Sequence, residues 1–160
     1  MPMPPSIDGD RLAAWRLLLE VHSSLTTRLA RELAEERDLP LTWYDVLVSL
    51  SEAEGGRRRL QDLVGSLLLS KSGISRLVDR MEGAGLIVRA TCPSDRRGQF
   101  AVLTDAGRAA LDQAAPVHLR GVEDHFATHL DDADVAALRR ALGKLRAANP
   151  ATRPLSSCGG

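Results

Sequence analysis

Apolar and polar positions in the first quarter of the chain alternate with the spacing of an α-helix. Leucines and Trp15 recur every three or four residues over residues 10–37, which is the pattern of an amphipathic helix. Pro40 closes this segment, because the residue before a proline avoids helical backbone angles. A second helix is predicted to begin at a Thr42 cap and to run to about Glu54.

Two shorter helices are predicted in the middle of the chain. One covers about residues 58–66, and the next covers about residues 71–84 after a Ser70 cap. The second of these carries one apolar stripe at the spacing i, i+3, i+4, i+7. Its members are Ile74, Leu77, Val78 and Met81. We expect the stripe to pack inward and the opposite face of this helix to meet solvent or a partner.

A β-hairpin is predicted directly after this helix. Residues 86–91 and 99–103 are β-prone, and the turn-forming run Pro-Ser-Asp-Arg-Arg-Gly lies between them. Thr104 and Asp131 then cap two further helices, to about Leu130 and about Ala148. The predicted fold is therefore mainly α with a small β-hairpin wing. A helix followed by a basic hairpin is the layout of a winged helix-turn-helix lobe, here joined to further helices.

Charge separates the middle of the chain from the rest. The net charge is zero, but residues 57–97 hold nine basic and four acidic side chains, a balance of +5. The remaining 12 basic and 17 acidic side chains give −5. A basic patch confined to the third and fourth predicted helices and the hairpin predicts a double-stranded DNA partner.

The composition limits the other function classes. No apolar run approaches the roughly 20 residues that span a bilayer, and the first residues lack the features of a signal peptide, so a cytoplasmic location is expected. Free thiols are expected for Cys92 and Cys158. The chain has no phosphate-binding loop and no familiar catalytic motif, so neither an enzyme nor a cofactor is predicted.

The predicted DNA contacts lie on the outer face of the fourth helix and on the hairpin. Small side chains at the start of that helix allow close approach to the bases, and arginines can reach guanine edges, phosphates or the minor groove. An aspartate beside the hairpin arginines is expected to hold one of them in place. The predicted contacts are Ser70, Lys71, Ser72, Gly73, Ser75, Arg76, Arg80, Arg89, Arg96 and Arg97, with Asp95 as support of the wing.

Two strings carry a resemblance to a known family. LQDLVGSLLLSKSGISRLVDRMEGAGLI, followed by DRRGQFAVLTDAGRAAL, resembles the MarR family of transcriptional regulators from about Leu41 to Leu111. The resemblance implies an obligate homodimer whose interface is built by the first, fifth and sixth helices. It also implies that two winged-helix lobes bind adjacent turns of a pseudo-palindromic operator, with Arg97 at the tip of the wing.

This resemblance divides the chain into regions. Residues 38–104 are expected to form the winged helix-turn-helix DNA-binding lobe, and residues 10–37 and 105–148 the helical dimerisation region. Residues 1–9 are expected to form a mobile N-terminal arm, and residues 149–160 a disordered tail.

The family also implies a sensing site between the dimer helices and the lobe, where phenolic or carboxylated compounds bind. Three of the five aromatic residues of the chain fall in two short segments of this region, and they can stack on an aromatic ligand. The proposed pocket residues are Trp15, Arg16, His22, Trp43, Tyr44, Asp45 and His118. A urate-like ligand is an alternative, and so is simple packing of these aromatics in the core and dimer interface.

The predicted function is a homodimeric, ligand-responsive DNA-binding regulator, a repressor that a small aromatic effector releases from its operator. Alternatives within the same fold are metal sensing by His118, His125 and His129 and oxidant sensing by Cys92. A winged-helix module that binds protein is a further alternative. No metal site is predicted, because no cysteine is near these histidines and interface packing explains them.

Overall fold

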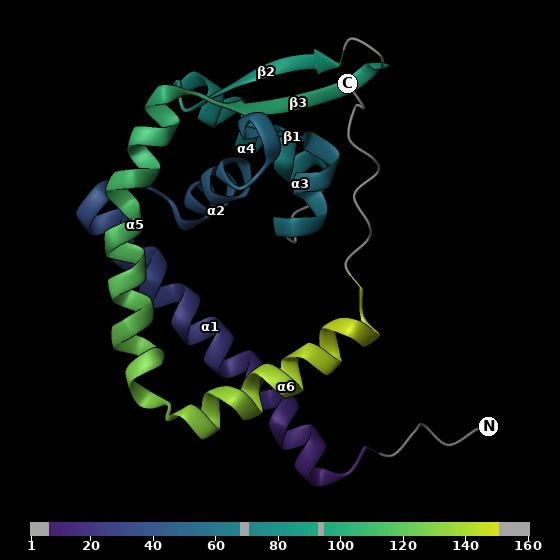
Figure 1. Cartoon of the computed structure of the whole chain (residues 1–160), viewed down its shortest axis with the longest axis vertical. Coiled ribbons are helices and arrows are strands. Elements are labelled where there is room, and N and C mark those ends of the chain that lie inside the picture. Colours follow the sequence, from purple (N-terminus) through teal and green to yellow (C-terminus); the bar gives the residue numbers. More distant parts are fainter. Residues whose placement is uncertain (1–6, 68–70, 93–94, 151–160) are drawn as a thin grey trace, which may run out of the picture.

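The computed structural model describes residues 7–67, 71–92 and 95–150, drawn in colour in Figure 1. The fold is mainly helical with one small antiparallel sheet, as predicted. The elements are α1 (Gly9–Arg37), α2 (Leu41–Ser51), the 3-10 turn η1 (Glu54–Gly56), β1 (Arg57–Arg59), α3 (Leu60–Leu67), α4 (Lys71–Gly83), β2 (Ile87–Cys92), β3 (Asp95–Leu103), α5 (Asp105–His125), the 3-10 turn η2 (Ala127–His129) and α6 (Asp132–Ala148).

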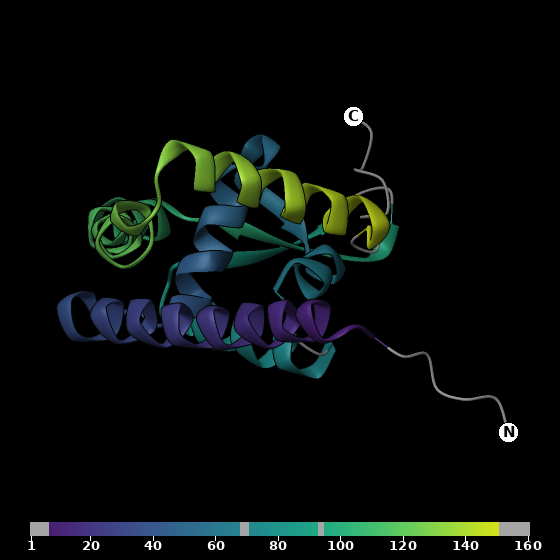
Figure 2. The ribbon, with the colours of Figure 1, turned by 90° about the horizontal axis from the view of Figure 1, so that it is seen from below.

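The elements form two regions. The winged-helix lobe (residues 41–103) contains α2, α3, α4 and the sheet, and the helical frame contains α1, α5 and α6 (Figure 1). In Figure 1 α6 passes across α1, but Figure 2 shows the two helices well apart, with elements of the lobe visible between them. The helical frame is therefore joined through α5, and α6 runs back from the end of α5 beneath the lobe.

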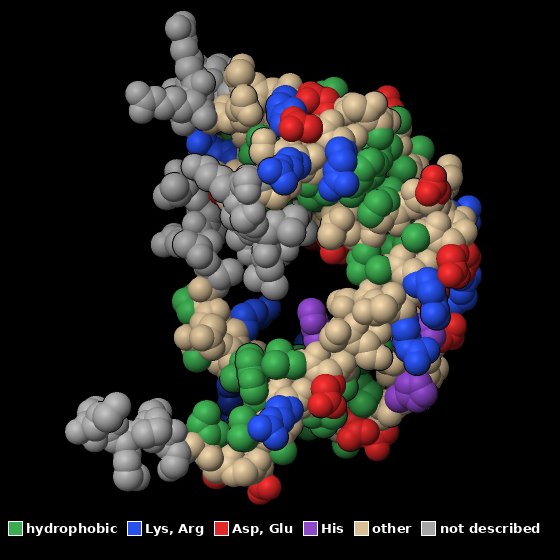
Figure 3. Space-filling model, turned by 180° about the vertical axis from the view of Figure 1, so that it is seen from behind, with side chains coloured by type: hydrophobic (Ala, Val, Ile, Leu, Met, Phe, Trp, Pro, Cys, Tyr) green, Lys and Arg blue, Asp and Glu red, His purple; other side chains and the backbone are tan. Residues whose placement is uncertain are grey.

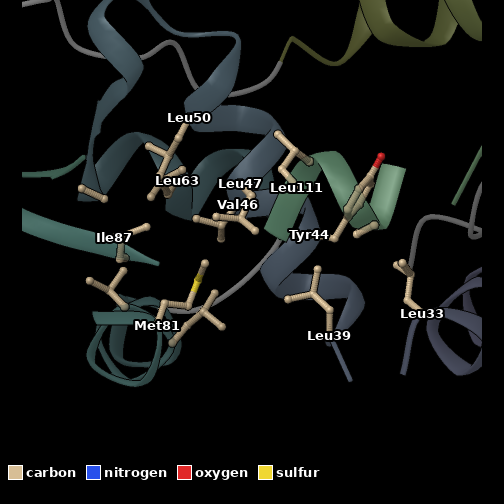
Figure 4. Packing of buried hydrophobic residues seen from close by; sticks show 14 of the residues in the cluster. Leu33, Leu39, Tyr44, Val46, Leu47, Leu50, Leu63, Met81, Ile87 and Leu111 are labelled. Carbon is tan, nitrogen blue, oxygen red and sulfur yellow. The ribbon is translucent and has the colours of Figure 1, made fainter. Parts of the chain in front are cut away.

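The core lies in the lobe and at its junction with the frame. The predicted stripe of α4 is confirmed, because Ile74, Leu77, Val78 and Met81 are all buried. These side chains pack with Leu47 and other residues of α2, and with residues of α3, β2 and α5, as Figure 4 shows. From α1, only Leu33 is fully buried among the described residues. The lobe thus completes its own core with a small contribution from the frame.

The start of α2 differs from the prediction. The helix begins at Leu41, directly after Pro40, and Thr42 does not cap it because no side chain makes the capping hydrogen bond. A proline suits this place, since its missing N–H would have no helical partner there. The helix also ends at Ser51 rather than near Glu54, and Gly55 and Gly56 form a turn with φ of 65° that leads into the sheet.

A third strand replaces the start of the predicted third helix. Arg57, Arg58 and Arg59 form β1, which pairs antiparallel with β3, and α3 begins only at Leu60. The guanidinium groups of Arg57 and Arg59 each lie 5.5 Å from the centre of the Phe100 ring, where a cation is attracted to the aromatic face. Pairing with a strand about 40 residues later in the chain, rather than the local preference of the arginines, therefore determines the strand conformation of this segment.

The helix after the wing begins as predicted and ends early. The Thr104 side chain accepts the N–H of Gly107 at the start of α5, and Asp131 forms a capping box with Asp134 at the start of α6, so both caps are confirmed. The helix α5 ends at His125 instead of near Leu130, because Phe126 leaves the helical angles with φ of −131° and the turn η2 follows.

Candidate functional site

The outer face of α4 carries the first part of the candidate DNA-binding surface. Ser75, Arg76 and Arg80 are exposed on the side opposite to the buried stripe. Within the described part of the chain, neither Arg76 nor Arg80 forms an ion pair, so both guanidinium groups are available to a partner. Gly73, near the N-terminal end of α4, is half-buried.

The hairpin beside α4 is formed by β2 and β3, which pair antiparallel and shift register between Thr91 and Cys92. The strand bounds place Asp95 at the start of β3. Several predicted contacts concern side chains outside the described residues, so their roles stay predictions. These are Ser70, Lys71, Ser72, Arg96 and Arg97, together with Asp95 and the proposed sensor Cys92.

Arg89 has an environment that the sequence did not indicate. Its Nη2 lies 2.6 Å from Oδ1 of Asp79, and its Nη1 lies 2.6 Å from Oε2 of Glu82. Its backbone N–H also donates to Oε1 of Glu82 at 2.9 Å. The proposed DNA contact of Arg89 stays a prediction, but its side chain is engaged by two carboxylates of α4.

Arginines outside the predicted set add to the charge of the lobe. The sequence interpretation assigned Arg58 and Arg59 to a helix, and β1 instead carries both, together with Arg57, along the edge of the sheet. Arg58 Nε donates to the carbonyl of Ser49 at 2.7 Å, which ties β1 to the end of α2. The basic segment therefore includes side chains that hold the lobe together.

Part of the proposed effector pocket is brought together where α2 meets α5. The rings of Tyr44 and His118 lie 4.5 Å apart between centroids, at an angle of 33°. The Nδ1 atom of His118 is buried and has no hydrogen-bond partner. Trp43 is half-buried and packs against the core, which agrees with the alternative that these aromatics fill space.

Electrostatics at this junction follow from burial. Burial lowers the pKa of the His118 imidazole below its usual value, although the nearby Asp45 carboxylate acts in the opposite direction. Burial also raises the pKa of the Asp45 carboxyl, against the influence of His118. Asp45 has an exposed surface, but the surrounding protein is dense enough to disfavour its charge. The junction therefore combines an aromatic face, a carboxyl group and an imidazole.

The other proposed pocket residues lie elsewhere in a single chain. Trp15, Arg16 and His22 are exposed on α1, and Trp15 has 56% of its surface accessible. Leu33, where α1 enters the core, follows Trp15 by 18 residues, which is about 27 Å along a helix at 1.5 Å per residue. One copy of the chain thus brings together Tyr44, Asp45 and His118 but not the three α1 residues.

The histidines of α5 and η2 do not gather as a metal site among the described residues, where no group of three His, Cys, Asp or Glu side chains has suitable placement. Nε2 of His125 instead lies 2.5 Å from Oε1 of Glu32 on α1. This contact joins α1 to α5 beside Gly121, where an added Cβ would lie 2.5 Å from the Glu32 carboxylate. None of the described helices has the length and apolar character needed to cross a membrane.

Comparison with known proteins identifies the family. Residues 37–98 match the model of the MarR family. The structure of AbsC, a MarR family transcriptional regulator from Streptomyces coelicolor, is 39% identical, with a TM-score of 0.81 over 91% of this chain and 97% of that one. This chain therefore belongs to the MarR family of DNA-binding transcriptional regulators.

Two further relatives extend the comparison. Sco3205, a MarR family regulator from Streptomyces coelicolor solved in complex with DNA, is 30% identical, with a TM-score of 0.84 over 96% of this chain and 98% of that one. The HTH-type regulator YkoM of Bacillus subtilis is 36% identical over 63 residues, and this match spans 39% of this chain and 41% of YkoM.

Proposed function

We propose that this protein is a homodimeric repressor that binds a pseudo-palindromic operator with two lobes and leaves it when a small aromatic effector binds. The observation that carries the proposal is the contrast between its surfaces. The lobe presents unpaired arginines on α4, while the frame presents apolar side chains that nothing in the described chain covers.

The apolar surface of the frame supports a second copy as partner. On α6, Val135, Leu142 and Leu145 are exposed, and no described α6 side chain is fully buried. On α1, exposed apolar side chains extend from Trp15 to Val21. Figure 3 shows the molecule hollowed between the lobe and the frame, with hydrophobic side chains on the frame beside the hollow. Apolar surface of this kind marks an interaction site, and a two-fold dimer would cover both helices at once.

DNA binding through α4 and the wing is supported by the exposed arginines and by the DNA complex of Sco3205. The test is titration of a fluorescent duplex, selected by the protein from a random-sequence library, at several salt concentrations. Light scattering on the same sample gives the mass. We expect a dimer and a linear fall of log K with log salt. Arg76→Gln and Arg97→Ala should each weaken binding and reduce the salt slope by about one. A monomer, or an affinity that salt does not change, would contradict the proposal.

The effector site is supported by the cluster of Tyr44, Asp45 and His118. Tyr44 and Nδ1 of His118 are buried within the chain, so an aromatic acid or phenol would enter by separating α2 from α5 locally. It would then stack against the ring of Tyr44 and satisfy Nδ1 of His118. Thermal shift measurements with salicylate, 4-hydroxybenzoate, urate and zinc chloride test this, since a ligand that binds the folded state raises the melting temperature.

A positive compound should also release the selected duplex, because an effector acts only through tighter binding to the DNA-free state. His118→Ala should abolish both the rise in melting temperature and the release of the duplex. His22 lies on the exposed face of α1, so His22→Ala tests whether a second copy brings that residue into the site. If none of the four compounds changes melting or DNA affinity, the effector part of the proposal fails.

A further inference from the structure

The contact of Arg89 with α4 forms a unit that we call the α4–β2 clamp, made of Arg89, Asp79 and Glu82. The guanidinium spans two carboxylates one turn apart on the same helix, each at 2.6 Å. Asp79 and Glu82 are spaced by three residues, so they lie on one face of α4. Hydrogen bonds between charged groups are roughly twice as strong as those between neutral groups. The clamp therefore links the wing to the helix by three hydrogen bonds.

The backbone part of the clamp lies at the edge of the sheet. The strand order is β1-β3-β2, so β2 has one unpaired side. The N–H of Arg89 is on that side and donates to Glu82, whose other oxygen accepts from the guanidinium. The bonds from the backbone N–H and then the side chain of Arg89 hold the pKa of the Glu82 carboxyl below its usual range. The Glu82 carboxylate therefore satisfies a backbone N–H at the unpaired edge of β2. The same carboxylate also holds the side chain of Arg89.

The base of the hairpin is anchored separately. The N–H of Leu86 donates to the carbonyl of Met81, and the hydroxyl of Thr104 donates to the carbonyl of Gly85. A Cβ on Gly107 would lie 2.1 Å from the carbonyl oxygen of Leu86, so α5 fits directly against this turn. With the base held in this way, and Ile87 buried in the core beside the apolar stripe of α4, the clamp adds a polar contact between β2 and α4 further along the strand.

We infer that Arg89 is a positioning residue for DNA binding, which holds the wing and α4 at the relative angle that lets both meet one duplex. This inference relies on the proposed DNA contact of α4 and the wing. A direct contact of Arg89 with DNA would require its guanidinium to leave two carboxylates, and Asp79, which is exposed, would then face the phosphates without compensation.

Removal of a carboxylate distinguishes the clamp from simple electrostatics. Glu82→Gln takes away one negative charge near the DNA-binding face, so charge alone predicts tighter binding. The clamp predicts weaker binding, by about tenfold, which corresponds to about 1.4 kcal/mol. Glu52→Gln is the matched control, because Glu52 is an exposed carboxylate at the end of α2 with no ion pair in the described chain. It should leave the affinity unchanged or slightly higher.

The salt slope distinguishes positioning from contact. Arg89→Gln should weaken binding to the selected duplex without changing the slope, whereas Arg76→Gln should reduce the slope by about one. Arg89→Lys keeps the charge but cannot span both carboxylates, so it should recover only part of the affinity. The double variant Arg89→Gln with Glu82→Gln should bind no worse than the weaker single variant, because both remove the same contact.

Several outcomes would overturn the inference. A slope that falls in Arg89→Gln as in Arg76→Gln would make Arg89 a DNA contact. Glu82→Gln that binds as tightly as the wild type would show that the clamp does not act on DNA. Melting temperatures identify a variant that fails to fold. If Glu82→Gln fails, Asp79→Asn replaces it, because this change removes only one exposed contact of Arg89, and weaker DNA binding is again expected. Wild-type protein without any affinity for duplex DNA would contradict the proposed function itself.

Discussion

The winged-helix lobe and the helical frame differ in how far one copy of the chain completes them. In the lobe, α2, α3, α4 and the sheet bury a continuous apolar cluster, with leucines such as Leu47 and Leu63 fully inaccessible. In the frame, α6 has only exposed or half-buried side chains, with Leu142 41% accessible and Leu145 52% accessible. Both regions have amphipathic helices, but only the lobe supplies what its apolar faces pack against.

This difference indicates two sources of stability. The lobe is stabilised by contacts within the chain, and its stability should not depend on protein concentration. In the proposed dimer the partner buries the apolar stripe of the frame, so the stability of the frame should follow mass action. The same division separates the proposed functions, since the self-contained lobe presents the candidate DNA-binding surface and the incomplete frame presents the proposed dimer interface.

The largest expected effect is in the core of the lobe. Leu47→Ala removes a fully buried side chain of α2, and truncation of buried leucines costs about 2–5 kcal/mol including the cavity left behind. Urea unfolding followed by circular dichroism measures the change, which should be the same at 1 and 100 times the protein concentration. A loss that shrinks as the protein concentration rises would show that the lobe also depends on the partner.

The contact between the wing and α5 gives the next effect. Gly107→Ala places a Cβ where the carbonyl oxygen of Leu86 lies 2.1 Å away, and backbone cannot yield as a flexible side chain can. Overpacking of this kind costs about 1–3 kcal/mol. The melting temperature should fall, and DNA affinity should fall with it because the base of the hairpin shifts. An unchanged melting temperature would mean that α5 and the α4–β2 turn separate easily.

A leucine in the frame provides the matched substitution for Leu47. Leu142→Ala changes an exposed side chain of α6, so the free energy of unfolding of a single copy should hardly change. In the proposed dimer it should weaken association by about tenfold, or about 1.4 kcal/mol. Sedimentation equilibrium measures the dissociation constant directly. Equal dissociation constants for the variant and the wild type would remove Leu142 from the proposed interface.

The same contrast explains how much could be predicted from the sequence. The stripe of α4 and the two caps at Thr104 and Asp131 depend on residues close in the chain, and each was predicted correctly. The hairpin was predicted at the right place, but β3 begins at Asp95, four residues before the predicted start. The strand β1 was missed because Arg57–Arg59 has no alternating apolar pattern and pairs only through β3. The end of α5 was placed too late because helical spacing continues past His125 although the backbone does not.

The candidate site follows the same rule. Arg76 and Arg80 could be assigned to the outer face of α4 from the stripe alone, and the structure leaves both exposed. The engagement of Arg89 could not be seen in the same way, because it depends on how tightly the turn at Gly85 folds β2 back on α4. Trp15 and Tyr44 looked equivalent as aromatic residues of adjacent helices, and the structure separates them because α1 is long.

A pH experiment sharpens the comparison at the junction of lobe and frame. Burial lowers the pKa of His118 below its unfolded value of 6.5, so the unfolded state takes up a proton before the folded state does. Stability should therefore fall as the pH drops through 6.5 towards the folded pKa, by at most about 1.4 kcal/mol per pH unit.

Substitution His118→Gln should flatten the stability of the chain between pH 7.5 and the folded pKa. Asp45 acts with the opposite sign, since burial raises its pKa and the folded state gains relative stability as the pH falls. Asp45→Asn in the His118→Gln background isolates that second contribution. Urea unfolding at a series of pH values measures both, and a His118→Gln profile identical to that of the wild type would show that His118 titrates freely.

The smallest expected effect uses a glycine in the frame as the counterpart of Gly107. A Cβ on Gly143 of α6 would meet nothing within 4 Å in the single chain. Replacement of a helical glycine by alanine there should stabilise α6 by about 0.5–1 kcal/mol through backbone entropy. If a partner helix packs closely over Gly143, the added methyl group would instead weaken the dimer. Thermal unfolding at several concentrations distinguishes the two cases: a gain at every concentration means that the partner leaves this position open, while a loss of dimer affinity would place the closest helix contact of the interface at Gly143.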